Sequence, residues 1–155
     1  EQSELTVYNL DIDTNAVRLS GLLVDEAGLR GRVLPLEGDA LDMPFKDAFA
    51  DLVVSRGSIP FWPDQAKGLR ECYRILKPGG VAYIGGGFSR ILDPDVRGRI
   101  VKRRQEMFAR KTPDGWQSID HLDAVALDAG IPQSQVRFIK EPVVGWWLEI
   151  RKPVE

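Results

Sequence analysis

The chain has 155 residues, with 21 basic and 23 acidic side chains and a formal net charge of −2 at pH 7. This length is enough for one domain with a hydrophobic core, and the balanced charge argues against a nucleic-acid binder, which needs a basic surface. The single cysteine excludes an internal disulfide and a multi-cysteine metal site, and it fits a reducing, cytoplasmic setting. No apolar run approaches the ~20 residues of a membrane-spanning helix, so we expect neither a membrane nor a nucleic acid as partner.

The start of the chain alternates between strand and helix patterns. Residues 5–10 are rich in β-branched and aromatic side chains, which predicts a strand. Apolar residues at helical spacing predict a helix over 16–27, with Asp13 or Thr14 as its N-cap. A short apolar run at 33–36 predicts the second strand.

The middle of the chain continues this alternation. Strands are expected at 49–54 and 81–84, and the amphipathic helix between them, 64–76, ends where a proline and two glycines follow. Helical spacing returns in 94–110 and again in 118–129.

The end of the chain carries two strand patterns, 135–140 and 145–152, separated by four residues. This connection is too short for a parallel crossover, so the pair should form an antiparallel hairpin. The earlier alternation of strands and helices predicts a parallel sheet covered by helices. We therefore predict an α/β fold, mostly parallel with an antiparallel C-terminal hairpin, in a single domain over 1–155.

Four segments of the chain resemble the class I S-adenosylmethionine-dependent methyltransferases, particularly the small-molecule group similar to the ubiquinone and menaquinone methyltransferases. They are Leu10–Asp13, Glu37–Phe45, Phe49–Val54 and Arg70–Gly80, of which the last is the most specific. The resemblance implies a Rossmann-like methyltransferase sheet, S-adenosyl-L-methionine as cofactor and a small-molecule methyl acceptor. Because the sulfonium is already a strong electrophile, proximity and orientation would suffice for transfer. We accordingly predict neither a catalytic acid–base residue nor a metal.

One part of the family pattern, its first strand and helix with a glycine-rich loop, is not found in this sequence. The run Gly85–Gly87 is no substitute, because it follows a later strand. In the family this strand lies at the centre of the sheet. Three interpretations are open: a fragment, a sheet that another segment completes, and a rearranged sheet. Unpaired strand edges favour pairing with another chain, so a second copy or a partner chain could complete the sheet.

The predicted cofactor site lies at the ends of the first two strands. By the resemblance, Asp11 accepts the ribose hydroxyls, and Ile12 packs on the adenine. Asp39 would accept the adenine amino group, and Ala40 would offer its backbone amide. The competing interpretations are a helix-capping Asp11, a core Ile12 and a local turn at Asp39.

Further candidates follow the later strands. Ser55 and Arg56 follow the strand at 49–54, where their backbone would contact the cofactor or substrate. The Arg56 side chain could bind a carboxylate or phosphate of the substrate, or form a surface ion pair. Phe61 and Trp62 could hold an aromatic or isoprenoid substrate, or pack under the following helix. Gly86 would allow close backbone approach to the substrate, or form a tight turn.

Two other functions remain open. A NAD-binding oxidoreductase would use Asp11 equally well, although Gly38–Ala40, the helix stop at 77–80 and the closing hairpin argue against it. A non-catalytic or partner-completed binding subunit would explain why the glycine-rich loop is not found. His121, the only histidine, has no matched partner in the sequence, and we predict no catalytic role for it.

Overall fold

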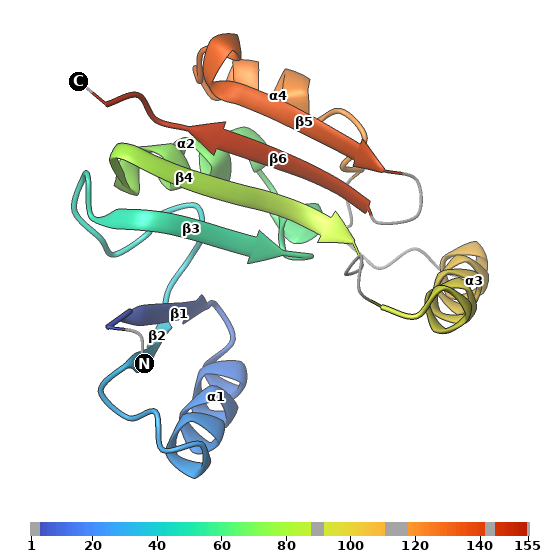
Figure 1. Cartoon of the computed structure of the whole chain (residues 1–155), viewed down its shortest axis with the longest axis horizontal. Helices are drawn as coiled ribbons and strands as arrows, with labels where there is room; N and C mark the ends of the chain where they lie inside the picture. Colours follow the sequence, from blue (N-terminus) through green and yellow to red (C-terminus); the bar gives the residue numbers. More distant parts are fainter. Residues whose placement is uncertain (1–3, 88–91, 111–117, 142–144, 155) are drawn as a thin grey trace. The chain divides into compact units, whose positions relative to one another are not determined.

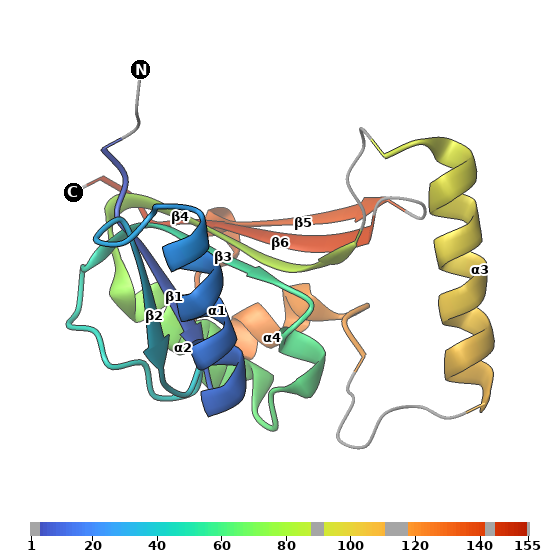
Figure 2. The same cartoon turned by 90° about the horizontal axis from the view of Figure 1, so that it is seen from below.

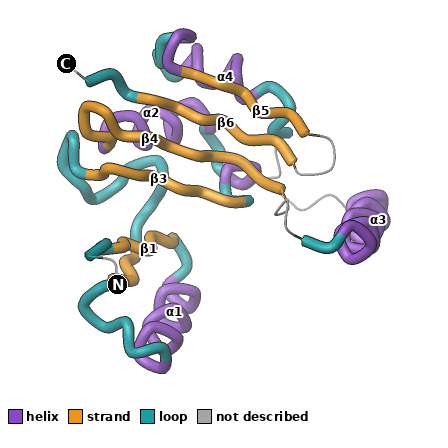
Figure 3. The backbone as a smooth tube through the Cα atoms, in the orientation of Figure 1, coloured by secondary structure: helices purple, strands orange, loops and turns teal. Residues whose placement is uncertain are grey.

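The computed structural model describes residues 4–87, 92–110, 118–141 and 145–154. The chain clusters into two compact units, Glu1–Phe45 and Lys46–Glu155. Strands and helices occur in both units (Figures 1 and 3). The single domain over 1–155 stays a prediction. No helix among the described residues combines the length and the apolar character needed to cross a bilayer.

The first unit is a strand–helix–strand arrangement. It contains β1 (Val7–Asp11), α1 (Thr14–Glu26) and β2 (Val33–Glu37). The two strands pair in parallel, with Asp11 opposite Glu37. Their carboxyl ends therefore lie side by side, which is where open parallel sheets bind ligands.

Local signals explain both ends of α1. The Asp13 carboxylate accepts a hydrogen bond from the backbone amide of Asn15 at 2.8 Å, which confirms one of the two predicted N-caps. At the other end Gly28 has a φ of 66°, a conformation that glycine adopts without a steric penalty. The sequence predicted the helix well because both signals are local.

The second unit holds a four-stranded sheet of order β3-β4-β6-β5. Its strands are β3 (Ala50–Arg56), β4 (Leu76–Gly87), β5 (Val136–Glu141) and β6 (Gly145–Arg151). β3 and β4 are parallel, whereas β6 is antiparallel to both β4 and β5. The closing strands thus form the predicted antiparallel hairpin, with β6 between β4 and β5 (Figure 1).

Helices α2 (Gln65–Ile75) and α4 (Leu122–Asp128) cover one face of this sheet, as Figure 2 shows. The remaining elements are η1 (Ile59–Phe61), α3 (Pro94–Arg110) and η2 (Gln133–Gln135). Eight fully buried side chains form the centre of the core: Leu69, Cys72, Ala82, Ile84, Leu122, Ala126, Leu148 and Ile150. They come from α2, α4, β4 and β6, so the apolar faces that the sequence predicts for both helices do face the sheet.

Two element boundaries differ from the sequence expectation. β4 begins at Leu76 rather than at residue 81, because the intervening residues pair with the ends of neighbouring strands: Leu76 lies opposite Ala50, and Lys152 N donates to Gly80 O at 3.0 Å. Helix α4 begins at Leu122 rather than near Ser118. The Ser118 hydroxyl donates to the Asp120 carboxylate and does not cap the helix.

Candidate functional site

The carboxyl ends of β1 and β2 form a candidate site within the first unit. The backbone amide of Gly38 donates to Asp11 O at 2.9 Å and so ties the two strand ends together. A Cβ at Gly38 would lie 2.6 Å from Leu10 Cδ1, which explains why a glycine stands there. This close approach brings Asp11 and Asp39, which directly follows Gly38, to the same edge of the sheet.

Both aspartates use one carboxylate oxygen in the same way. Asp11 Oδ1 accepts from the amide of Asp13 at 3.0 Å, and Asp39 Oδ1 accepts from the amide of Leu41 at 2.8 Å. These are the local turns that aspartate favours. Within the described part of the chain, no hydrogen bond reaches the Oδ2 atom of either residue, so each keeps an oxygen that can accept from a ligand.

The neighbouring side chains suit a nucleoside. Ile12 is 70% exposed at the end of β1, where it offers an apolar surface to a flat ring. Ala40 follows Asp39 and is half-buried. Thr14 donates its hydroxyl to Glu37 Oε2 at 2.9 Å and orients this third carboxylate at the same strand ends. The sequence interpretation missed Glu37, although its place after an apolar strand was a usable signal.

The carboxyl ends of β3 and β4 form another candidate site, within the second unit. Gly57 N donates to Gly85 O at 2.6 Å. The Arg56 guanidinium donates to Gly87 O from Nε at 3.0 Å and from Nη2 at 2.8 Å. Arg56 therefore holds the two strand ends together through a carbonyl group, and no carboxylate among the described residues pairs with it.

The loop after β3 carries the predicted serine and aromatic residues. The Ser55 and Ser58 hydroxyl groups are hydrogen-bonded to each other. Phe61 is 52% exposed, whereas Trp62 is buried. A Cβ at Gly68 would lie 2.4 Å from Trp62 Cε3, so the indole packs directly against the α2 backbone.

The glycines at the end of β4 have different roles. A Cβ at Gly85 would lie 2.2 Å from Trp146 O, so the pairing of β4 with β6 requires a glycine there. At Gly86 the nearest atoms to a Cβ would be Gly57 Cα at 3.7 Å and Ile119 Cδ1 at 3.9 Å, which is ordinary contact. The packing thus leaves room at Gly86 and also places residue 119 beside the strand ends.

Residues 118–121 form a turn before α4, and a buried glutamine holds this turn in place. Gln65 is 5% exposed, and its Nε2 donates to Ile59 O at 3.1 Å and to Ser118 O at 3.2 Å. In the turn, Asp120 Oδ1 accepts from Ser118 Oγ and lies 3.0 Å from His121 Nδ1. The hydrogen bonds from His121 and Ser118 lower the pKa of Asp120 below its ordinary value. Its carboxylate is therefore ionised at neutral pH.

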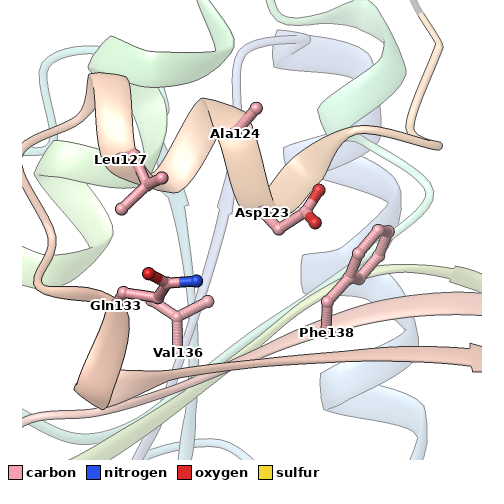
Figure 4. Close-up of a pocket in the computed structure, with 6 residues that line it drawn as sticks. All are labelled: Asp123, Ala124, Leu127, Gln133, Val136 and Phe138. Atoms are coloured by element: carbon pink, nitrogen blue, oxygen red, sulfur yellow. The ribbon is translucent and has the colours of Figure 1, made fainter.

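A separate hollow of about 300 Å³ lies between α4 and β5 (Figure 4). The residues that line it are Asp123, Ala124, Leu127, Gln133, Val136 and Phe138. One carboxylate and one amide are its polar side chains, and none of the residues predicted for the site belongs to it. The hollow therefore plays no part in the candidate site.

The fold is that of an α/β protein with carboxylates at adjoining ends of parallel strands. Residues 1–84, more than half of the chain, match the methyltransferase domain family. The chain belongs to this family, the class I S-adenosylmethionine-dependent methyltransferases. The predicted resemblance, fold class and cofactor are confirmed.

A solved structure supports this assignment. The chain is 32% identical to a protein assigned as an S-adenosyl-L-methionine-dependent methyltransferase from Methanococcus maripaludis, with a TM-score of 0.81. The match covers 99% of this chain and 70% of that one. Four helices and a mixed sheet in the described residues agree with the fold expected from the sequence.

Two curated relatives match shorter segments. Over 51 residues the chain is 55% identical to the chloroplastic 2-methyl-6-phytyl-1,4-hydroquinone methyltransferase of Spinacia oleracea, which covers 33% of this chain and 15% of that protein. Over 73 residues it is 37% identical to the demethylmenaquinone methyltransferase of Lactiplantibacillus plantarum, covering 47% and 31%. The chain thus spans less than a third of the length of either relative.

The residues at the ends of β1 and β2 fit the family's cofactor. Carboxylate oxygens of Asp11 and Asp39 remain available, and exposed Ile12 can cover one face of an adenine. When bound, S-adenosylmethionine supplies an electrophilic methyl group on a sulfonium. The chain's own residues would bind its adenosine part.

Proposed function

We propose that this chain binds S-adenosylmethionine and takes part in methyl transfer to a small-molecule acceptor. The observation that supports this most directly is the pair Asp11 and Asp39, held at one strand edge by the Gly38 N–H···O bond to Asp11. Each carboxylate uses Oδ1 for its own turn, which fixes the direction of the remaining oxygen. Neither a NAD-binding oxidoreductase nor a non-catalytic subunit is favoured by the family match.

In this proposal the residues of the first unit recognise adenosine. Asp11 accepts the ribose hydroxyls, because a carboxylate at a strand end can receive two neighbouring O–H donors. Asp39 accepts from the adenine amino group, Ala40 donates its backbone amide, and Ile12 packs on the ring. None of these roles needs a change in protonation at neutral pH.

In the second unit we propose that the ends of β3 and β4 face the reacting groups. The backbone of Ser55 and Arg56 would contact the cofactor, and Gly86 would contact the acceptor. Phe61, exposed in the loop after β3, would pack on an aromatic acceptor, while Trp62 supports this loop from beneath α2. The names of both curated relatives specify quinone-type substrates, so we propose a hydroquinone ring as the acceptor class.

Calorimetric titration with S-adenosylhomocysteine tests cofactor binding without turnover. We expect one site with a micromolar Kd, about −8 kcal/mol. Asp11→Asn and Asp39→Asn should each weaken binding by about 10- to 100-fold, because each removes a charged hydrogen-bond acceptor worth roughly 1.5–3 kcal/mol. Asp25→Asn is the matched control: it makes the same change in this unit, at a carboxylate that pairs with Arg30 at the far end of α1.

Two results would contradict the proposal. A folded wild-type chain that does not bind the product would remove the cofactor site. Equal weakening by Asp25→Asn and Asp39→Asn would show that charge, rather than a specific contact, governs the affinity. The cytoplasmic location and a second copy or partner chain that completes the sheet stay predictions.

A further inference from the structure

His121 lies at the same sheet edge as the proposed acceptor site. Ile119, two residues earlier, would contact a Cβ on Gly86 at 3.9 Å, and Gln65 ties Ser118 to η1. Helix α4 begins directly after His121 and precedes β5 in the chain. Strand β5 is parallel to β4, because both are antiparallel to β6. The first residues of α4 therefore lie at the carboxyl end of the sheet, where β3 and β4 also end.

The imidazole of His121 is oriented by its neighbour. Nδ1 lies 3.0 Å from Asp120 Oδ1, and this carboxylate is itself held by the Ser118 hydroxyl. Because an ionised carboxylate can only accept, Nδ1 must carry the proton of this hydrogen bond. In the neutral ring, Nε2 then has a free lone pair, and the side chain is 52% exposed.

We propose that His121 Nε2 is the general base that removes a proton from a phenolic hydroxyl of the methyl acceptor, with Asp120 as its positioning residue. This inference rests on the methyltransferase function proposed above. It differs from the sequence interpretation, which assigned His121 no catalytic role because no partner was visible. The partner is the adjacent residue, and the turn at Ser118 gives the pair its geometry.

The proton and electron balance of the step is simple. The hydroxyl proton moves to His121 Nε2 and leaves an imidazolium ion, which Asp120 stabilises. An electron pair of the resulting phenolate oxygen forms a bond to the methyl carbon. The bond from this carbon to sulfur breaks, and the sulfur keeps the electron pair as a neutral thioether. The imidazolium then returns to neutral, so that one proton is released to solvent overall.

Among the described residues, two charged groups on the elements around the turn, Asp64 and Arg56, have hydrogen-bond partners of their own. Asp64, at the start of α2, accepts from the backbone amide of Lys67 at 2.8 Å. The Arg56 guanidinium donates to Gly87 O. Asp123, in the first turn of α4, lines the hollow between α4 and β5. Within the described part of the chain, Asp120 is thus the charged group that is hydrogen-bonded to His121.

The test uses 4-nitrophenol, whose anion absorbs visible light, with the full chain saturated with S-adenosylhomocysteine. Below the pKa of the free phenol, we expect the wild type to bind it as the anion, paired with the His121 imidazolium. His121→Gln should reduce the bound anion by about tenfold or more. Asp120→Asn should give an intermediate loss, and Asp123→Asn, a matched removal of a nearby carboxylate, should leave the spectrum unchanged.

Methyl transfer to methylhydroquinone gives the second readout. His121→Gln should lower kcat/KM by ~10²-fold at neutral pH and remove the acidic limb of its pH profile. Unchanged spectra and pH profiles in His121→Gln would overturn the inference while leaving the cofactor site standing. Failure of the product-saturated wild type to bind nitrophenol would overturn it too. A wild type that does not bind S-adenosylhomocysteine would instead contradict the proposed function itself.

Discussion

Glu149 is the best-defined point at which to test the energetics of the second unit. Only 3% of this residue is exposed, at the middle of the β4-β6-β5 sheet. Its carboxylate accepts hydrogen bonds from Tyr83 Oη, from Arg137 Nη2 at 2.8 Å and from Arg151 Nε at 2.8 Å. Tyr83 and Arg137 lie directly opposite Glu149 on the two neighbouring strands. One carboxylate therefore links three strands.

The pKa of Glu149 gives the expected magnitude. Burial would raise it, but the hydrogen bonds from Arg151, Tyr83 and Arg137 outweigh burial and lower the pKa from 4.5 to about 2. Each pKa unit corresponds to about 1.4 kcal/mol, so the shift sets an upper bound of roughly 3 kcal/mol at neutral pH. The arginine side chains are 67% and 60% exposed, and solvent screening reduces this to about 1–3 kcal/mol.

We therefore expect Glu149→Gln to lower the free energy of unfolding by about 1–3 kcal/mol at pH 7. Because the folded-state pKa is depressed, this contribution is complete above about pH 4.5 and is lost as the pH falls through about 2. Urea titrations followed by tryptophan fluorescence measure the free energy of unfolding of the second unit, because all four tryptophans follow residue 46. The difference between variant and wild type should shrink steadily below pH 4.5.

The matched control is Asp51→Asn, which removes the exposed ion pair between Asp51 and Lys77 in the same sheet. An exposed pair of this kind contributes little, so a change below about 0.5 kcal/mol is expected. The reasoning on Glu149 is refuted if Glu149→Gln is as mild as this control at pH 7. It is also refuted if the loss has the same size at pH 3 as at pH 7.

Two further predictions concern the core of the second unit. Gly68→Ala should destabilise this unit by about 1–3 kcal/mol, because the new Cβ would overlap the Trp62 ring. Gly98→Ala has open space around it in α3 and should stabilise the helix by up to about 1 kcal/mol. Urea titration measures the free energy of unfolding of both variants, and a Gly68→Ala variant more stable than the wild type would contradict the packing of Trp62 against α2. Burial raises the pKa of the Cys72 thiol to about 12, so a disulfide reagent should react with it only when the chain unfolds. Rapid reaction in native buffer would show that the core opens locally.

Local signals account for what the sequence predicted correctly. The cap at Asp13 and the stop after α1 depend on neighbouring residues alone, and the four-residue link at 141–144 leaves the closing strands no option but to pair antiparallel. The start of β4 was placed five residues late, because Leu76 enters the strand only by pairing with Ala50. Such pairing depends on distant residues, and no local pattern reports it.

The candidate site divides in the same way. Asp11 and Asp39 could be picked out because each follows an apolar strand, a pattern visible in a single sequence. The position of the 118–121 turn could not be predicted from the sequence, because the contact that places the turn joins Gln65 to Ser118 across 53 positions of the chain. A buried glutamine with two backbone acceptors is a tertiary feature. Its only trace in the sequence is a polar residue in the first turn of an amphipathic helix.

The acidity of the acceptor decides whether His121 matters at all. A sulfonium needs no acid catalysis, so an acceptor that is already ionised requires only alignment with the methyl group. A phenol that stays protonated at the working pH must lose its proton in or before the transfer, and the gain from a base is then largest. The effect of His121→Gln on kcat/KM should therefore be large for weakly acidic hydroquinones and should fall toward none as the acceptor becomes more acidic. A loss that is equal across such a series would mean that His121 positions the acceptor instead of deprotonating it.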